Sequence, residues 1–346
     1  MMVEQRVWTS VWVPDHLRGL PPFAIDAFLS PWSMLGAFAE LAPKMTFGVA
    51  VTDGIRLHPA TLAQNAASLD HQTGGHFILG IGAGEKMNLA VYGFDSHRAV
   101  SRLRECIDVM RHLWTEAGPM DFQGHFFRLR KAVLEPKPLQ QPFPVWVAGN
   151  GPKTRQLAAE MANGWFPFPT LPSEYKAGLT DIRTRLKQMG RPPSSLARGF
   201  WGRLFMHDDP AQVSQYLQGQ REQLALDPGV LRQLGYWRDE YTDLYKAQGL
   251  DPEHLSLLTY DADDVARLDM NKLLPIVADI PEKVLAKTAL AGSAEELTKK
   301  LEAFIRAGVD HFCLEIINGA SQRNAPFTYW DVSRILAERV IPPLKT

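Results

Sequence analysis

Seven short runs of β-branched, aromatic and other apolar residues recur along this chain of 346 residues, and helical patterns lie between them. Most of each run is continuously apolar, which is typical of strands buried on both faces of a parallel sheet. Strands that alternate with helices predict an α/β fold, and over this length they favour a TIM-like (β/α)8 barrel over a doubly wound sheet. The predicted strands cover residues 6–13, 45–51, 76–81, 144–149, 164–167, 199–206 and 311–317.

Helices are predicted over residues 59–72, 97–116, 152–163 and 293–307. Two of them open on a proline, and the last opens on the capping-box spacing of Ser293 and Glu296. Because only seven strands are predicted and the first lies almost at the N-terminus, we expect the barrel to lack its first strand and helix. We expect a single barrel domain over residues 1–346, with a polar, aromatic-rich insertion at about 227–273 near the barrel mouth.

The overall composition argues against several classes of function. The net charge of −1 gives no basic surface for nucleic acid, and no apolar run is long enough to span a membrane. The N-terminus lacks the layout of a signal peptide, and Cys106 and Cys313 lie in a helical and a strand pattern. We therefore expect a cytoplasmic enzyme with reduced core thiols. No common zinc, disulfide-redox or nucleophile-elbow motif occurs, so we expect no metal.

The most conspicuous motif is FILGIGAGEKMNLAVYGFD at residues 77–95. Its glycines suggest a dinucleotide-binding loop, but Glu85 stands where the third glycine of that fingerprint should fall. A carboxylate there would repel a pyrophosphate. The motif is therefore interpreted as a buried strand that ends in a glycine turn and presents Glu85.

Four successive strands end in titratable residues or glycine turns. The first ends in Asp15-His16, the second in Asp53-Gly54, the third in Gly84-Glu85 and the fourth in Gly149-Asn150-Gly151-Pro152. In a barrel these ends meet at the rim that carries catalytic groups. His16 and Glu85 are candidates for acid–base work. The alternatives are a helix N-cap for Asp15, a packed His16, and a first-turn glutamate that stabilises the next helix for Glu85.

Two further features concern ligands. The turn from Gly149 to Pro152 suits a single phosphate, because a glycine turn and a helix N-terminus both present free N–H groups. The alternative is a tight turn with no ligand. An apolar substrate pocket is expected from three residues in and directly after the fifth predicted strand, with core packing as the alternative: Trp165, Phe166 and Phe168.

Three blocks of sequence resemble the luciferase-like monooxygenase superfamily, and within it the branch that uses the deazaflavin coenzyme F420. They are VWVPDHL, FGVAVTDGIRLHPATLAQNAASLDHQTGGHFILGIGAGEKMN and FPVWVAGNGPKTRQLAAEMANGWF, in family order over residues 11–166. The resemblance implies a barrel of the bacterial-luciferase type, a homodimer, and a cofactor held at the C-terminal rim. The overall layout is also similar to the phthiodiolone ketoreductases.

The resemblance also implies roles for particular residues. His16 would be the catalytic histidine, and Glu85 the acid near the deazaflavin ring. A non-proline cis peptide would fall at Ala50-Val51. The cofactor contacts it implies are Asp15, Ala50, Val51, Ala83, Gly84, Asn88, Gly149, Asn150, Gly151 and Pro152.

This sequence departs from the sugar-phosphate dehydrogenases of that branch, since Leu20 stands near the place of their tryptophan and PFPTLPSEY replaces their substrate-binding lysine. We therefore expect an F420-dependent oxidoreductase that moves a hydride between the deazaflavin C5 and a carbonyl or alcohol carbon of an apolar small molecule. One alternative is an FMN-dependent luciferase-like monooxygenase. The other is a non-catalytic, truncated paralogue, because an open barrel exposes sheet edges.

Overall fold

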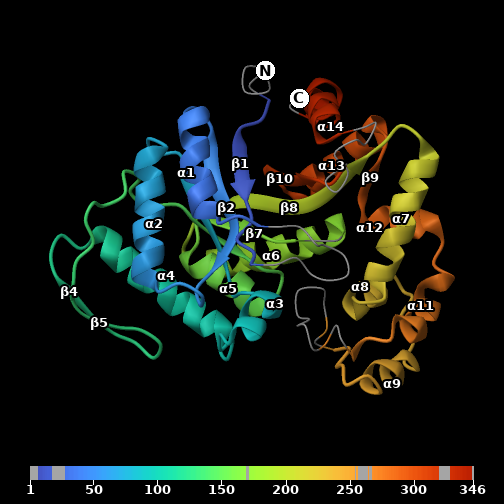
Figure 1. Cartoon of the computed structure of the whole chain (residues 1–346), viewed down its shortest axis with the longest axis horizontal. Coiled ribbons are helices and arrows are strands. Elements are labelled where there is room, and N and C mark those ends of the chain that lie inside the picture. The colour runs from blue at the N-terminus through green and yellow to red at the C-terminus, as the bar shows by residue number, and fades with distance from the viewer. Residues whose placement is uncertain are drawn as a thin grey trace.

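The computed structural model describes residues 7–17, 28–168, 171–253, 255, 264, 267–318 and 328–344. A curled parallel sheet occupies the centre, and helices cover its outer face (Figure 1). This α/β, barrel-type architecture is the one predicted from the sequence. The position expected for Leu20 lies outside the described residues.

The central sheet consists of parallel strands that follow chain order. The neighbours are β1 (Ser10–Val13), β2 (Thr46–Asp53), β3 (Phe77–Gly82), β6 (Val145–Ala148), β7 (Gly164–Phe166), β8 (Ala197–Met206) and β10 (His311–Ile316). Each matches a predicted strand. A further short strand, β9 (Leu290–Gly292), pairs with the end of β8 and was not predicted. Its three residues are too few to show a pattern.

The sheet is open between β1 and β10. No backbone pairing joins these two strands among the described residues, and the tie between them is made by side chains. The His311 Nε2 atom lies 3.1 Å from Ser10 Oγ and 3.3 Å from Trp12 Nε1. An open edge at this place agrees with the expected absence of a first strand, but the absence itself stays a prediction.

Longer helices cover the outer face of the sheet. They are α1 (Pro31–Leu41), α2 (Pro59–Gln72), α4 (Ala99–Thr115), α5 (Pro152–Met161), α6 (Pro172–Gln188) and α13 (Ala294–Ala307). Four of them, α2, α4, α5 and α13, match predicted helices. The capping box of Ser293 and Glu296 is formed at the start of α13. The sequence analysis missed α1 and α6, although both begin with a proline.

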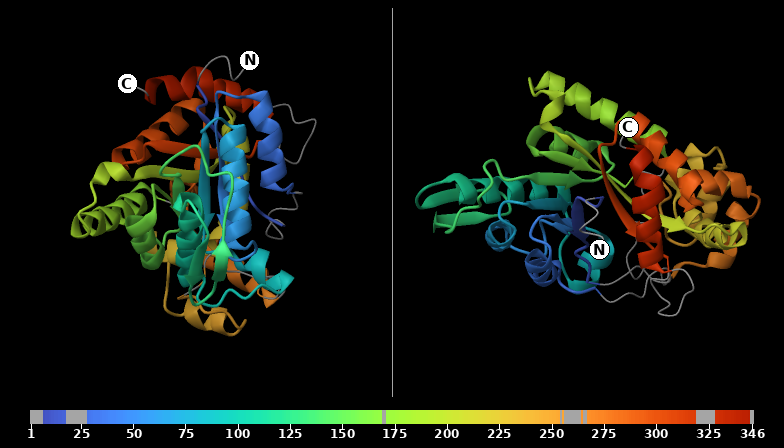
Figure 2. Two further views of the ribbon diagram at one scale, coloured as in Figure 1. Left: turned by 90° about the vertical axis from the view of Figure 1, so that its left-hand side faces the viewer. Right: turned by 90° about the horizontal axis from the view of Figure 1, so that it is seen from above.

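Two parts of the chain stand apart from the barrel. An unpredicted antiparallel hairpin, β4 (Met120–Gln123) with β5 (Arg128–Ala132), extends away from the sheet (Figures 1 and 2). A helical lobe has an apolar cluster of its own. This lobe contains α7 (Pro210–Leu224), α8 (Pro228–Gln233), α9 (Tyr241–Lys246), α11 (Met270–Ala278) and α12 (Glu282–Thr288). It includes much of the predicted insertion at 227–273.

Several short elements complete the described chain. They are α3 (Lys86–Leu89), η1 (Ala90–Tyr92), η2 (Pro193–Ser195), α14 (Tyr329–Ile335), the π-helical turn η3 (Leu336–Val340) and α15 (Ile341–Leu344). An ion pair of 3.6 Å between Lys86 Nζ and Asp264 Oδ2 ties α3 to the segment that follows α9. The helical lobe therefore reaches the barrel next to Glu85.

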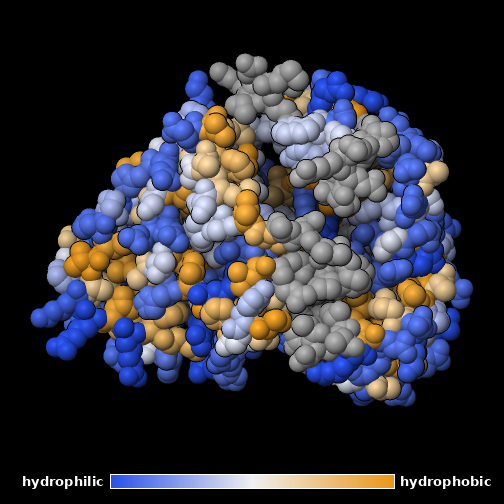
Figure 3. Space-filling model, in the orientation of Figure 1, coloured by the Kyte–Doolittle hydropathy of each residue, from blue (hydrophilic) through white to orange (hydrophobic). Residues whose placement is uncertain are grey.

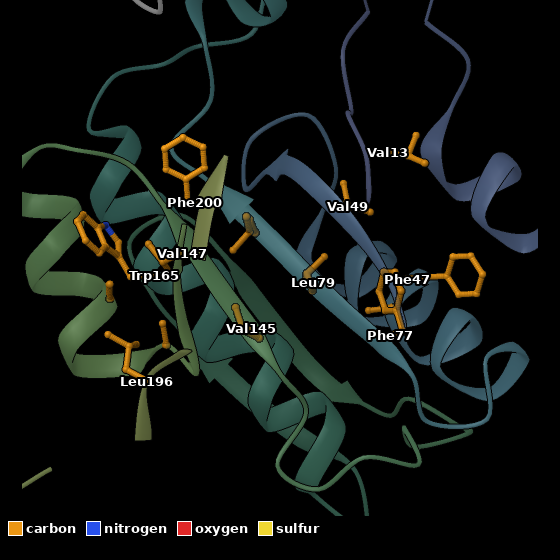
Figure 4. Close-up of a cluster of buried hydrophobic side chains, with 14 of the residues drawn as sticks. Val13, Phe47, Val49, Phe77, Leu79, Val145, Val147, Trp165, Leu196 and Phe200 are labelled. Carbon is orange, nitrogen blue, oxygen red and sulfur yellow. The ribbon is translucent and has the colours of Figure 1, made fainter. Parts of the chain in front are cut away.

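Alternation along the strands divides the buried side chains into two groups. Side chains such as Phe47, Leu79 and Val145 face the surrounding helices and form the main core (Figure 4). Trp146 and Phe166 instead lie inside the barrel, in a small cluster with neighbouring strand residues. On the outer surface, hydrophobic side chains gather in patches between hydrophilic ones (Figure 3). In the described residues, no helix is both long and apolar enough to cross a membrane.

Candidate active site

A pocket of about 220 Å³ lies at the C-terminal ends of the central strands. The predicted site residues that line it are Asp15, His16, Ala50, Val51, Ala83, Gly84, Glu85, Asn88, Gly149, Asn150, Phe166 and Phe168. Gly151, Pro152 and Trp165 are not part of its wall. The remaining wall residues were not singled out from the sequence: Thr52, Asp53, Arg56, Gly82, Ala148, Thr154, Pro167 and Trp201.

Three side chains form a compact polar cluster at one end of this pocket. His16 follows β1, while Glu85 and Asn88 lie at the start of α3. The His16 Nδ1 atom is 2.8 Å from Asn88 Nδ2 and 3.4 Å from Glu85 Oε2. Asn88 Nδ2 donates to Glu85 Oε2 at 3.2 Å. The cluster therefore joins two titratable groups that lie 69 positions apart in the sequence.

Burial holds both titratable groups of the cluster toward their neutral forms. It raises the pKa of Glu85, although His16 and the hydrogen bond from Asn88 oppose the effect. Burial also lowers the pKa of His16, which the nearby Glu85 carboxyl opposes. A protonated carboxyl can donate a proton, and a neutral imidazole can accept a proton or donate a hydrogen bond, which is what acid–base chemistry at such a rim needs.

Asp15 is held beside the cluster by Arg56 and Thr52. Arg56 Nη2 lies 3.1 Å from Asp15 Oδ2, and the Thr52 hydroxyl donates to the same oxygen at 2.6 Å. Arg56 also pairs with Asp53. Burial raises the pKa of Asp15, while the Arg56 guanidinium lowers it. The sequence analysis missed Arg56, yet its place three residues after Asp53, in the turn after β2, could have suggested a rim position.

An aromatic wall faces the pocket from β7 and β8. Phe168 and Trp201 pack with ring centroids 4.8 Å apart, and Phe166 lies next to them in the barrel interior. The prediction for Trp165 is corrected, because this side chain points out of the barrel. Its ring packs on Tyr175 and its Nε1 donates to the Gly149 carbonyl at 2.9 Å. In the short strand β7 only alternate side chains can face inward, and Phe166 takes that place.

The turn from Gly149 to Pro152 is shaped by hydrogen bonds. Gly149 has a φ of +136°, a conformation that favours glycine. The Asn150 amide binds the Phe168 backbone, donating to its oxygen at 2.8 Å and accepting from its nitrogen at 3.1 Å. Helix α5 begins immediately afterwards at Pro152, and the first N–H groups of a helix have no partner inside it. Gly149 and Asn150 reach the pocket, whereas Gly151 and Pro152 shape the helix start behind it.

The residues present fit a deazaflavin cofactor. The non-proline cis peptide at Ala50-Val51, expected from the resemblance, is present, and both residues line the pocket. A Cβ atom at Gly82 would lie 3.3 Å from Val51 Cγ2, so the glycine keeps this wall open. Flat apolar faces, a buried carboxyl at Glu85 and a helix N-terminus for a phosphate are the groups that a phosphate-bearing deazaflavin needs.

In the described part of the chain, no group of three or more His, Cys, Asp or Glu side chains is arranged to hold a metal ion. The groups of this site are those of acid–base and hydride-transfer chemistry.

Comparison with known proteins agrees with this geometry. The family model for luciferase-like monooxygenases matches residues 2–311. A phthiodiolone/phenolphthiodiolone dimycocerosates ketoreductase of Mycobacterium sp. (strain JLS) is 37% identical over 207 residues, which is 54% of each chain. The ketoreductase of that name from Mycobacterium kansasii is 28% identical over 334 residues, covering 90% of this chain and 87% of the relative.

An F420-dependent enzyme is also among the relatives. The F420-dependent glucose-6-phosphate dehydrogenase of Nakamurella multipartita is 31% identical over 168 residues, 47% of this chain and 48% of the relative. Among solved structures, an F420-dependent secondary alcohol dehydrogenase in complex with an F420–acetone adduct superposes with a TM-score of 0.73 at 23% identity. That superposition covers 98% of this chain and 91% of the other. This likeness establishes the shared fold.

Proposed function

This chain belongs to the luciferase-like monooxygenase family, and on that premise we propose that it is a coenzyme F420-dependent oxidoreductase. It transfers a hydride between C5 of the deazaflavin and the carbonyl or alcohol carbon of an apolar substrate. The observation that supports this most directly is the pocket itself. It combines His16 and Glu85, whose pKa values burial shifts toward the neutral forms, with an aromatic wall.

The choice of cofactor rests on the relatives and on the polar groups of the site. One relative is named as F420-dependent, and others are named as ketoreductases. The deazaflavin supplies a hydride donor or acceptor at its C5 atom when it is bound. Ala50, Val51, Ala83 and Gly84 line the space for the ring, and the turn at Gly149–Pro152 with the start of α5 receives the phosphate.

The chain's own residues provide binding, orientation and proton transfer. For a ketone, His16 would supply the proton that the alkoxide oxygen needs, and its Nδ1 would take up a proton from the Glu85 carboxyl 3.4 Å away, so the ring stays neutral; for an alcohol the two transfers would run in reverse. Burial raises the pKa of the Glu85 carboxyl, which favours its protonated form, and Glu85 would act as the acid near the deazaflavin ring. Asp15 contacts the cofactor and is fixed by Arg56 and Thr52. With cofactor and substrate bound, the pocket would hold the donor and acceptor carbons in one orientation, which would lower the entropic part of the barrier.

The substrate is an apolar ketone or secondary alcohol. Phe168 and Trp201 pack against each other in the pocket wall, and Phe166 lines the same pocket. Burying an apolar side chain or ligand group of this size is favourable by roughly 1.5–3 kcal/mol. The substrate's carbonyl is then directed toward His16 and its apolar part toward the wall.

A binding titration tests the cofactor assignment. The purified protein is titrated without oxygen with oxidised F420 and, separately, with FMN, and its intrinsic tryptophan fluorescence is followed. Micromolar binding of F420 alone, followed by ketone-dependent oxidation of reduced F420, is the expected result. Binding of FMN alone would move the protein to the oxygen-dependent members of the family, and binding of neither would favour a non-catalytic relative.

Three further parts of the proposal concern the oligomeric state, the location in the cell and the domain organisation. We propose a homodimer located in the cytoplasm, and a single domain over residues 1–346 with the insertion at 227–273 at the barrel mouth. The ion pair between Lys86 and Asp264 supports this placement of the insertion. Light scattering on the purified protein measures the assembly, and a monomer at all concentrations would contradict the dimer.

A further inference from the structure

The orientation of the Asn88 amide is fixed by the backbone. The Leu17 N–H donates to Asn88 Oδ1 at 2.8 Å, and a backbone N–H can only donate. The amide oxygen is therefore committed to Leu17, and the amide nitrogen must face the other way. Asn88 is buried, with 3% of its surface exposed, so it has little freedom to turn over.

The Asn88 nitrogen in turn determines which nitrogen of His16 carries hydrogen. Asn88 Nδ2 lies 2.8 Å from His16 Nδ1, and an amide nitrogen is a donor only. Two donors cannot share a hydrogen bond, so Nδ1 must be the unprotonated, accepting nitrogen. In neutral His16 the hydrogen then lies on Nε2.

We propose that Asn88 is a positioning residue that sets the tautomer of His16, keeping Nε2 protonated and opposing the imidazolium form. This inference deepens the proposed function, on which its catalytic meaning rests. A Nε2–H group is a hydrogen-bond donor for a carbonyl oxygen. With Nε2 protonated, the site is arranged to bind the carbonyl oxygen of a ketone. To act as the base in alcohol oxidation, Nε2 would have to be unprotonated, which is the other tautomer.

The imidazolium form requires a change of partner at Nδ1. A hydrogen on Nδ1 would meet the Asn88 N–H, so it must turn to Glu85 Oε2, which lies 3.4 Å away. The charged groups that act on His16 are Glu85, which favours its charge, and Arg56 and Arg203, which oppose it. Asn88 also opposes the positive charge of His16, because its amide nitrogen can donate to Nδ1 only when the ring is neutral.

Nuclear magnetic resonance of the cofactor-free protein tests the tautomer directly. Histidine labelled with nitrogen-15 in the ring is incorporated, and the His16 signals are assigned by their loss in His16→Gln. We expect Nδ1 at the shift of an unprotonated ring nitrogen and Nε2 at that of a protonated one. A protonated Nδ1 in the wild-type protein overturns the proposal.

Replacement of Asn88 provides the second measurement. Asn88→Ala removes the donor, so His16 should lose its single tautomer. Its titration midpoint should rise by roughly half to one pH unit, the size of one net hydrogen bond. Thr154→Ala is the matched control, because Thr154 lines the same pocket and donates to the Gly151 carbonyl instead. An unchanged tautomer and midpoint in Asn88→Ala would contradict the role of Asn88.

These measurements separate the inference from the proposed function. Both are made without cofactor, so a protein that fails to bind F420 still reports the tautomer. Circular dichroism shows whether Asn88→Ala folds. If it does not fold, the nitrogen-15 spectrum of the wild-type protein alone tests the His16 tautomer. In the active enzyme, Asn88→Ala should shift the pH profile of ketone reduction upward, which a loss of stability alone would not do.

Discussion

The Arg56 Nη2 atom lies 3.1 Å from the Asp15 carboxylate and 2.6 Å from the Asp15 backbone oxygen, so one guanidinium holds both the side chain and the main chain of the residue before His16. Arg56 also pairs with Asp53, and its own side chain is only 10% exposed. It thus ties the end of β1 to the turn after β2. Two carboxylates in the pocket wall depend on this single charge.

Replacing Arg56 by methionine should therefore destabilise the protein strongly. The change leaves Asp15 and Asp53 without their cation, and breaking a buried ion pair by removing one partner costs about 3–5 kcal/mol. Urea unfolding followed by circular dichroism measures the loss. Arg56→Lys is the matched control, since it keeps the positive charge but loses the forked geometry of the guanidinium. Its stability should lie between those of Arg56→Met and the wild type. Equal unfolding midpoints for Arg56→Met and wild type would show that this pairing is unimportant.

Glu85 should reduce the stability of the protein as pH rises. Burial raises the pKa of Glu85 above its ordinary value of 4.5, so the folded state favours the protonated carboxyl. The protonated carboxyl therefore contributes to the stability of the folded protein. This stabilisation is fully present below pH 4.5 and is lost as pH rises through the folded-state pKa of Glu85. Glu85→Gln, which cannot ionise, should be more stable than wild type at neutral pH, and the difference should vanish in acid. Chemical denaturation at several pH values measures it, and a difference that grows toward low pH would contradict the sign.

Trp201 should control affinity for the apolar part of the substrate. Trp201→Ala removes one face of the aromatic wall against Phe168, and should raise KM for apolar ketones about 10–100-fold, the effect of 1.5–3 kcal/mol. Phe304→Leu is the control, because Phe304 packs outside the barrel on Phe200. Steady-state kinetics with a series of ketones of increasing chain length provides the measurement. A KM that does not depend on chain length in either variant would exclude the wall as the substrate site.

The sequence predicted the layout of the candidate site correctly where polar residues directly follow an apolar strand. Polar residues directly after apolar strands, such as His16 and Glu85, do meet in one pocket, because parallel strands present their carboxyl ends at one rim. The same reasoning placed Phe168 in the pocket wall. Each of these positions follows from the strand that precedes it, so a local pattern was sufficient.

The features that sequence reasoning missed depend on contacts distant in the chain or on very short elements. Arg56 lies in a polar turn, and only the fold shows that its guanidinium reaches back to Asp15. The strand GWF is apolar throughout, so its pattern could not show that Trp165 faces the helices while Phe166 faces the pocket. Pairing with β6 determines that choice, and pairing is a property of the folded sheet.

His311 connects the two strands that lie on either side of the sheet opening. Its Nε2 atom is a shared partner of Ser10 Oγ at 3.1 Å and Trp12 Nε1 at 3.3 Å, and the indole can only donate. The His311 ring also lies edge-on to Trp12 and Trp146, with centroids 5.6 and 5.0 Å apart. Trp12 Nε1 also donates to Ser10 Oγ, at 2.9 Å, and the neutral tautomer with an unprotonated Nε2 lets His311 accept from both groups.

Acid should weaken this connection. Burial lowers the pKa of His311 below its ordinary value of 6.5, although Asp310 opposes this. The neutral ring thus contributes stability above pH 6.5, and the contribution is lost as pH falls from there through the folded-state pKa. His311→Gln keeps an acceptor but cannot be protonated, so its unfolding free energy should fall less than that of wild type between about pH 7 and pH 5. Because His16 titrates in both proteins, the difference between them isolates His311, and identical pH dependence would show that β1 is held by other contacts.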